Sequence, residues 1–138
     1  MQYYKVLSLN VNGIKNPIKR SKIVSKLKRE KIDIAFLQET HLSKEEHEKW
    51  KRMGFKNIYY ASHRSGKKRG VAILIPNKVG FEFTGEHKDK EGRFVLVKGK
   101  MEQEDVTLCN IYAPPGSSTG FFKEIFSLIA AESVGTCI

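Results

Sequence analysis

The sequence predicts an α/β fold in which helices pack against a layered β-structure. Before Gly54, two apolar strand patterns are each followed by a helical pattern. After Gly54, short β-prone segments recur at regular spacing, which is typical of a sheet-rich region. With 138 residues, 40% of them hydrophobic, the chain is long enough to form one domain with a core of its own.

The first half predicts the order strand, helix, strand, helix. The short run Lys5–Leu9 is followed by an Asn-Gly turn, and the apolar run at residues 32–40 is typical of a strand covered on both faces. Asn16-Pro17 predicts a helix start, with the asparagine as cap and the proline in the first turn. Ser43 and Glu46 form a capping box, which predicts the start of the second helix.

The second helix carries two large apolar residues on one side, Trp50 and Met53, and we expect both to pack into the core. The histidines all lie between residues 41 and 87 and lack the spacing of a metal site or a catalytic triad. We therefore expect all four at the surface: His41, His47, His63 and His87.

The second half predicts five strands and one helix. The strands are expected at Lys56–Ala61, Val71–Ile75, Phe81–Thr84, Arg93–Lys98 and Val106–Tyr112. Residues 62–70 form a basic connection that contains glycine, residues 86–92 form a charged turn, and residues 121–131 form an amphipathic helix. No strand pattern follows this last helix, so the sequence looks cut short.

The charge distribution favours a polyanionic partner. The net charge is +10, and residues 1–69 carry 18 lysines and arginines against 6 acidic residues, whereas residues 70–138 carry 7 against 9. A basic half is expected if one face meets phosphates, and a merely soluble basic surface is the alternative. No apolar stretch approaches the roughly 20 residues of a membrane span, and no secretory signal is visible. We expect an intracellular protein without a membrane partner.

Glu39 is the first candidate for chemistry. It follows an apolar strand pattern, at the edge where open α/β sheets bind ligands. Its carboxylate is a hard oxygen ligand, and magnesium commonly takes one or two such ligands together with several waters. The alternative is an exposed acid at the end of a strand, and Glu39 by itself does not decide between the two.

Two other strand ends also finish in polar residues. Asn10 and Asn12 follow the first strand with side chains on the same side, and their amides can hold a metal or its water or donate to phosphate. Asn110 and Tyr112 lie at the last predicted strand end, where a tyrosine hydroxyl can donate to a phosphate oxygen. The alternatives are an ordinary turn and a half-buried aromatic residue. Three polar strand ends together favour an active site.

Five segments together resemble one family: "LSLNVNGI", "DIAFLQETHL", "GVAILI", "KEGRFVLVKG" and "LCNIYAPP". They resemble successive landmarks of the endonuclease/exonuclease/phosphatase superfamily, which includes exonuclease III-type repair enzymes. The N-x-N-G and Q-E-T-H-L motifs and the segment "GKKRGVAIL" are most similar to the endonuclease domain of LINE-type non-LTR retrotransposon proteins. The resemblance runs from about Tyr4 to about Leu128 and leaves a divergent tail at about residues 129–138.

The resemblance implies that residues 1–138 form the N-terminal part of a four-layer α/β sandwich, two β-sheets flanked by helices, with an incomplete active site at one edge. It implies a magnesium-dependent phosphodiesterase, with manganese as an alternative metal, and DNA as the partner of a nuclear protein. Glu39 would bind the metal, Asn10 would lie near metal and phosphate, and Tyr112 would contact the phosphate during catalysis. Further candidates for phosphate or DNA contacts are Asn12, Asn110, Arg64, Lys67 and Lys68.

The sequence also departs from the family pattern. Asn12 stands where repair-type members often have aspartate, and Pro115 stands where the family usually has a phosphate-contacting asparagine. The chain contains neither the G-D-x-N segment nor the S-D-H segment. In the family these segments supply the aspartate that activates water and the histidine that stabilises the transition state. We therefore expect a retrotransposon-type endonuclease that is inactive by itself.

Two other functions stay open. The first is an exonuclease III-like repair endonuclease, which would cleave abasic DNA in preference to undamaged DNA. The second is a basic nucleic-acid-binding fragment without chemistry, whose salt-dependent DNA binding would survive the loss of Glu39.

Overall fold

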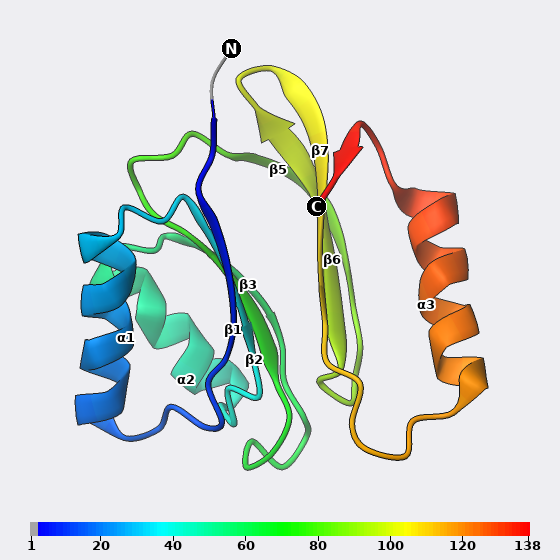
Figure 1. Ribbon diagram of the computed structural model, residues 1–138, viewed down its shortest axis with the longest axis horizontal. Coiled ribbons are helices and arrows are strands. Elements are labelled where there is room, and N and C mark those ends of the chain that lie inside the picture. Colours follow the sequence, from blue (N-terminus) through cyan, green and yellow to red (C-terminus); the bar gives the residue numbers. More distant parts are fainter. Residues whose placement is uncertain (1–2) are drawn as a thin grey trace.

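The computed structural model describes residues 3–138 as a sandwich of two four-stranded β-sheets with helices on both outer faces (Figure 1). Helices α1 (Pro17–Arg29) and α2 (Lys44–Glu48) cover the first sheet, and α3 (Thr119–Glu132) covers the second. The predicted four-layer α/β sandwich is confirmed, and all four layers lie within this chain.

The first sheet consists of β1 (Val6–Asn10), β2 (Ile34–Gln38), β3 (Asn57–Ala61) and β4 (Val71–Ile75), in the order β1-β2-β4-β3. β1 and β2 are parallel, and the other pairs are antiparallel. Beyond the end of β1, the N–H groups of Val11, Gly13 and Ile14 continue to donate backbone hydrogen bonds to the carbonyls of residues 38–40. The polar residues that follow β1 and β2 are therefore held side by side.

Local sequence signals set the helix starts on this sheet. The Asn16 side chain caps α1 by accepting hydrogen bonds from two backbone N–H groups of the first turn. The Ser43 hydroxyl accepts from the Glu46 N–H at 3.1 Å, and the Glu46 carboxylate accepts from the Ser43 N–H at 3.0 Å, which confirms the capping box. After α2 the chain continues as a 3-10 helix, η1 (Lys49–Met53), and Gly54 ends it with a φ of 97°.

The second sheet consists of β5 (Glu82–Lys88), β6 (Phe94–Met101), β7 (Glu104–Ile111) and β8 (Thr136–Cys137), in that order. β5, β6 and β7 are antiparallel, whereas β8 is parallel to β7. The turn between β6 and β7 contains Glu102 and Gln103, both with positive φ. Such turns match the right-handed twist of the strands that they join.

Two segments of the second sheet differ from the sequence prediction. Residues 86–88 extend β5 instead of forming a charged turn, because they pair with β6, where His87 lies opposite Leu96. Residues 136–137 form β8 after α3, where no strand is expected, because they pair with Val106 and Thr107 on β7. Long-range pairing decides both segments, and neither carries a local pattern that would reveal it.

Side chains of β2 alternate between two cores. Ala35 and Leu37 pack in the core beneath α1, whereas Ile34 and Phe36 pack in the core between the sheets. This alternation is the ordinary period of a strand with both faces covered. If β2 continued past Gln38 with the same alternation, residue 39 would face the helices.

The expected inward packing of the second helix is confirmed. Trp50 is buried in the core that also contains Ile23 and Leu27 of α1, and Met53 packs against this core. On the other side of the sandwich, α3 packs through Phe121 and Ile125. None of the helices within residues 3–138 has the length and apolarity needed to cross a membrane.

Candidate active site

Polar residues lie at or directly after the ends of three strands at one edge of the sandwich, the lower edge in Figure 1. Asn10 ends β1 and Gln38 ends β2, and since these strands are parallel and in register, Glu39 follows beside Asn10. Tyr112 follows β7, which faces the first sheet from the second. The fold thus brings together the three residues that the sequence analysis selects for metal and phosphate chemistry.

Glu39 departs from the alternation of the strand that precedes it. Because Ile34 and Phe36 face the second sheet, an extended chain would direct Glu39 toward the helices. Its backbone has a φ of 53° instead, and its Oε2 accepts a 2.6 Å hydrogen bond from Nδ2 of Asn10, which lines the groove between the sheets. Non-glycine residues rarely adopt such a φ, and residues that do so cluster at functional sites.

The Tyr112 hydroxyl lies next to this carboxylate. Burial, followed by the negative charge of Glu39 and a hydrogen bond to it, raises the pKa of Tyr112 above its ordinary value, while the positive charge of Arg69 opposes the shift. Tyr112 therefore keeps its proton at neutral pH and can donate it in a hydrogen bond. Arg69 lies within electrostatic reach of the site, although the sequence analysis does not select it.

Asn12 contributes to the site through its backbone. Its N–H donates to Oδ1 of Asn10 at 3.0 Å, and its carbonyl accepts from Nζ of Lys19 at 3.2 Å. Its φ is 46°, and the residue is exposed at the edge of the sheet. Asn12 thus forms the turn that orients the Asn10 amide toward Glu39.

Asn110 lies inside the sandwich, which differs from the surface position expected for a DNA contact. The residue is 2% exposed, and its Nδ2 donates to the carbonyls of Leu37 and Ala72, both at 2.9 Å. Its Oδ1 accepts from Nε2 of Gln38 at 2.7 Å. Buried amides need partners for all their polar atoms, and those of Asn110 come from two strands of the opposite sheet, β2 and β4. Asn110 joins the two sheets beneath the site.

His41 lies at the candidate site, whereas the sequence predicts only a surface histidine. Its Nε2 lies 3.7 Å from Oε1 of Glu39, and its ring packs against Gly13, where an added Cβ would lie 2.7 Å from Nδ1 of His41. The only sequence signal is its place two residues after Glu39. Without the neighbouring loop, that spacing does not distinguish a site residue from a surface histidine.

The prediction that the histidines lie at the surface is wrong for two of them. His47 has no exposed surface, and His63 is 6% exposed. The ring nitrogens of both histidines have hydrogen-bond or ion-pair partners inside the protein, so their burial leaves no polar atom unpaired. Composition and sequence spacing do not reveal these partners.

A basic loop at residues 62–70 is tied to the chain that follows β2. The carbonyls of Arg69 and Gly70 accept backbone hydrogen bonds from the N–H groups of His41 and Thr40, at 2.8 and 3.1 Å. The loop therefore lies directly beside the candidate site. Its exposed cationic residues are Arg64, Lys67 and Lys68.

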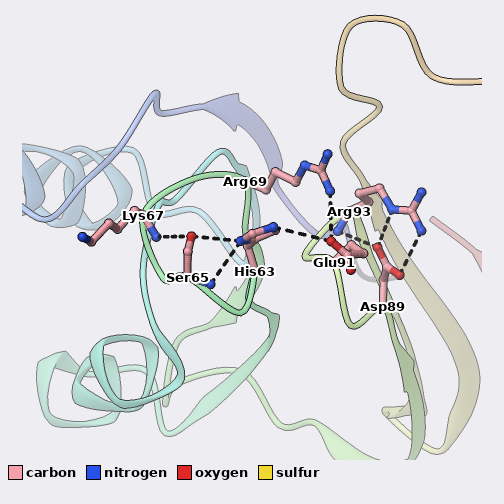
Figure 2. A network of polar contacts seen from close by, with 7 residues as sticks. All are labelled: His63, Ser65, Lys67, Arg69, Asp89, Glu91 and Arg93. Atoms are coloured by element: carbon pink, nitrogen blue, oxygen red, sulfur yellow. Dashed lines mark hydrogen bonds and ion pairs between the residues drawn. The ribbon is translucent and has the colours of Figure 1, made fainter.

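Polar contacts hold the shape of this loop (Figure 2). Oγ of Ser65 lies 2.9 Å from Nδ1 of His63 and accepts from the N–H of Lys67 at 3.1 Å. On the other side of the imidazole, Oε2 of Glu91 lies 3.5 Å from Nε2 of His63 and 3.4 Å from Nη1 of Arg69. Burial, reinforced by nearby positive charge, lowers the pKa of His63.

The turn that carries Glu91 is itself fixed to the second sheet. Asp89 accepts hydrogen bonds from Nε and Nη2 of Arg93 at 2.7 and 3.2 Å (Figure 2). The Arg93 guanidinium lies 4.4 Å from the ring centroid of Phe121 on α3. The basic loop is therefore supported by a continuous set of contacts that reaches the outer helix.

A groove of about 530 Å³ opens beside the site, between β1 and the end of β7. β1 is the edge strand of its sheet, so the groove is accessible from outside. Part of its lining comes from Val6, Ser8 and Asn10 on one side and Ile111, Tyr112 and Ala113 on the other.

The donor set at this edge fits a hard divalent cation held mainly by water. Glu39 offers carboxylate oxygens, and Asn10 orients them through its Nδ2. Within residues 3–138, no group of three or more histidine, cysteine, aspartate or glutamate side chains could hold a metal. One carboxylate with several waters suits magnesium, which often binds proteins in this way.

Comparison with known proteins agrees with this geometry. A family model described as Endonuclease/Exonuclease/phosphatase family matches residues 7–129, which include all three strand ends. The chain belongs to the endonuclease/exonuclease/phosphatase family. A curated relative, the Transposon TX1 uncharacterized 149 kDa protein of Xenopus laevis, is 27% identical over 109 residues, which cover 79% of this chain and 8% of the relative.

Solved structures share the fold of this family member. The TDP2 structure from D. rerio, complexed with a single strand DNA product, has a TM-score of 0.67 at 14% identity and covers 96% of this chain and 57% of that one. The endonuclease domain of TRAS1, a telomere-specific non-LTR retrotransposon, has a TM-score of 0.60 at 12% identity and covers 94% and 53%. This chain thus spans just over half the length of each solved chain.

Proposed function

We propose that this chain carries the metal-binding and phosphate-binding part of a magnesium-dependent DNA endonuclease of the retrotransposon type. One observation carries the proposal: the carboxylate of Glu39, the amide of Asn10 and the hydroxyl of Tyr112 converge at one edge of the sandwich. The similarity to a transposon protein and to a retrotransposon endonuclease domain supports the choice of this branch of the family.

Each residue has a distinct role in the proposed reaction, which is hydrolysis of a phosphodiester bond. Glu39 would hold magnesium, which supplies positive charge to the phosphate oxygens. Asn10 keeps the carboxylate oriented, so that its position does not change as charge develops. Tyr112, which stays protonated at neutral pH, would donate a hydrogen bond to a non-bridging phosphate oxygen.

DNA is the proposed partner, and the nucleus is the proposed location. The exposed cations of the basic loop lie next to the site, and the first half of the chain, residues 1–69, carries the excess of positive charge. Cations of this kind contact the phosphate backbone and make binding salt-dependent. We propose that Arg64, Lys67 and Lys68 hold DNA beside Glu39, and that Arg69 adds positive charge near Tyr112.

We further propose that the chain alone cleaves DNA weakly or not at all. The described contacts of Asn10 and Tyr112 at this site involve one carboxylate, that of Glu39, which we assign to the metal. The site as proposed therefore lacks a second carboxylate to act as the base that activates water. Loss of a general base typically costs about 10²–10⁴-fold in rate.

Metal binding tests the proposal independently of cleavage. Titration of the purified chain with Mn²⁺, followed by electron paramagnetic resonance, should reveal one weak site that is lost in Glu39→Gln. The matched control is Glu91→Gln, which removes a carboxylate from the neighbouring turn and should keep the site. Equal Mn²⁺ binding by the wild type and Glu39→Gln would refute the metal-binding role of Glu39.

Nicking of supercoiled plasmid with magnesium tests the chemistry. Little or no nicking is expected, and strong nicking that Glu39→Ala abolishes would contradict the proposed inactivity while supporting the endonuclease assignment. Preferential cleavage of an abasic duplex would select a repair endonuclease instead. A DNA-binding fragment without chemistry would show neither Mn²⁺ binding nor cleavage, with DNA affinity that falls steeply with salt.

A further inference from the structure

We propose that Thr40 and His47 form a buried pair that positions Glu39 for metal binding. This inference rests on the proposed function, because it assigns a purpose to the conformation of the proposed metal ligand. Both side chains are buried. They would act on Glu39 indirectly, by fixing the backbone conformation of residues 39–41.

The pair is completely buried and joined by a hydrogen bond. Thr40 and His47 have no exposed surface, and Oγ1 of Thr40 lies 2.9 Å from Nε2 of His47. Nδ1 of His47 lies 3.0 Å from the carbonyl of Ser43 and 3.0 Å from Oγ of Ser62. A carbonyl can only accept, so the imidazole proton lies on Nδ1, and Nε2 accepts the proton of the Thr40 hydroxyl.

The imidazole is held in this orientation from its face as well. The His47 ring stacks on the ring of Tyr60, with centroids 4.7 Å apart and an angle of 10° between the planes. Burial lowers the pKa of His47 to about 4, so the ring is neutral at physiological pH and its Nε2 is available as an acceptor. The hydrogen bond from the Thr40 hydroxyl to Nε2 of His47 therefore exists in the metal-free protein at physiological pH.

Thr40 also connects three loops through its backbone. Its carbonyl accepts from the N–H of Ile14 at 3.0 Å, and its N–H donates to the carbonyl of Gly70 at 3.1 Å. An added Cβ at Gly70 would lie 2.4 Å from Oγ1 of Thr40, so the basic loop passes directly over the threonine hydroxyl. The segments that follow β1, β2 and β3 therefore meet at this one residue.

The residues on both sides of Thr40 adopt the left-handed conformation. Glu39 has a φ of 53° and His41 has a φ of 55°. A relaxed, extended chain would direct Glu39 toward the helices, away from Asn10 and Tyr112. Two such departures, one on each side of Thr40, persist only where the surroundings hold them, and the three hydrogen bonds of Thr40 supply that constraint.

Three variants test the pair. Thr40→Val keeps the shape of the side chain and removes the hydroxyl, Thr40→Ser keeps the hydroxyl, and Ile125→Ala is a control that destabilises α3 far from the site. If the pair positions Glu39, Thr40→Val should weaken Mn²⁺ binding about tenfold or more, as loss of outer contacts to metal ligands typically does. Thr40→Ser and Ile125→Ala should stay within about twofold of the wild type.

A second measurement does not depend on metal. In the metal-free protein, the Cα and Hα chemical shifts of Glu39 and His41 report their left-handed conformation by NMR. These shifts should move in Thr40→Val and should be retained in Thr40→Ser and Ile125→Ala. If Thr40→Val does not fold, His47→Gln takes its place in both measurements.

The outcomes separate this inference from the proposed function. A folded Thr40→Val protein with wild-type shifts, or with wild-type Mn²⁺ affinity, overturns the positioning role. Absence of Mn²⁺ binding by the wild type, together with shifts that move in Thr40→Val, overturns the metal site but retains the pair as the element that holds Glu39.

Discussion

The site edge of the first sheet and the α3 side of the second sheet are stabilised in different ways. Within residues 3–138, seven non-glycine residues have positive φ, and four of them lie at the site edge: Asn12, Glu39, His41 and Arg69. Hydrogen bonds between neighbouring loops hold this edge. By contrast, α3 is regular and contacts its sheet mainly through apolar side chains. Strain and buried polar groups are concentrated where the proposed chemistry takes place.

The largest effect should come from the apolar contact on the α3 side. Ile125 is 1% exposed, and Ile125→Ala should lower the free energy of unfolding by about 3–4 kcal/mol, because it leaves a cavity under α3. Phe126 is 64% exposed on the same helix, and Phe126→Ala should change stability by less than about 0.5 kcal/mol. Urea denaturation measures both, and equal effects would contradict the packing of α3 described above.

A single methyl group at the site edge should have almost as large an effect. Gly70→Ala places a Cβ 2.4 Å from Oγ1 of Thr40 at a φ of 93°, and it should cost about 3 kcal/mol of folding stability. Gly116 has a similar φ of 81° but open space around it, so Gly116→Ala should cost only about 1 kcal/mol. Equal losses of unfolding free energy for Gly70→Ala and Gly116→Ala, measured by urea denaturation, would show that the contact between the new Cβ and Thr40 adds no cost.

Acid should weaken the site edge through His47. Its pKa is lowered by burial from 6.5 in the unfolded chain to about 4 in the folded protein, so the unfolded state binds the proton first. The stability due to the neutral ring is fully present above pH 6.5 and is lost between pH 6.5 and 4, by about 2–3 kcal/mol.

Denaturation midpoints measured across this pH range test the assignment. His47→Gln removes the titrating group, so its stability should change less between pH 6.5 and 4 than that of the wild type. Parallel pH profiles of the two proteins would exclude His47 as the source of the loss. His63, whose pKa is also lowered by burial, is retained in both proteins and does not affect the difference.

Local patterns predict the starts of the first two helices and most strands correctly. Asn16-Pro17 and the pair Ser43 and Glu46 mark helix starts because capping involves only residues within one turn. Val71–Ile75 is an unbroken apolar run and forms β4 with the predicted bounds. β8 was not predicted, because its two residues carry no period and depend on pairing with β7.

The part of the candidate site that could be predicted from the sequence consists of polar residues at the ends of predicted strands. Asn10 ends a strand, whereas Glu39 and Tyr112 each directly follow one, and polar residues at such positions indicate a site at a sheet edge. The buried position of Asn110 was not predictable, because its partners Leu37 and Ala72 come from distant strands. That of His47 was not predictable, because its burial depends on Tyr60 and Ser62 from the region of β3. The role of Arg69 likewise depends on a loop contact that no local pattern reveals.

By itself, the sequence determined the α/β class, the basic first half and the residue types available for metal and phosphate chemistry. These properties follow from short-range periodicity, capping and composition. The tertiary structure alone decided where Glu39 points, because its left-handed backbone and the contacts of Thr40 reverse the direction that strand alternation would give it. Such a conformation is costly in isolation and exists only where three loops meet.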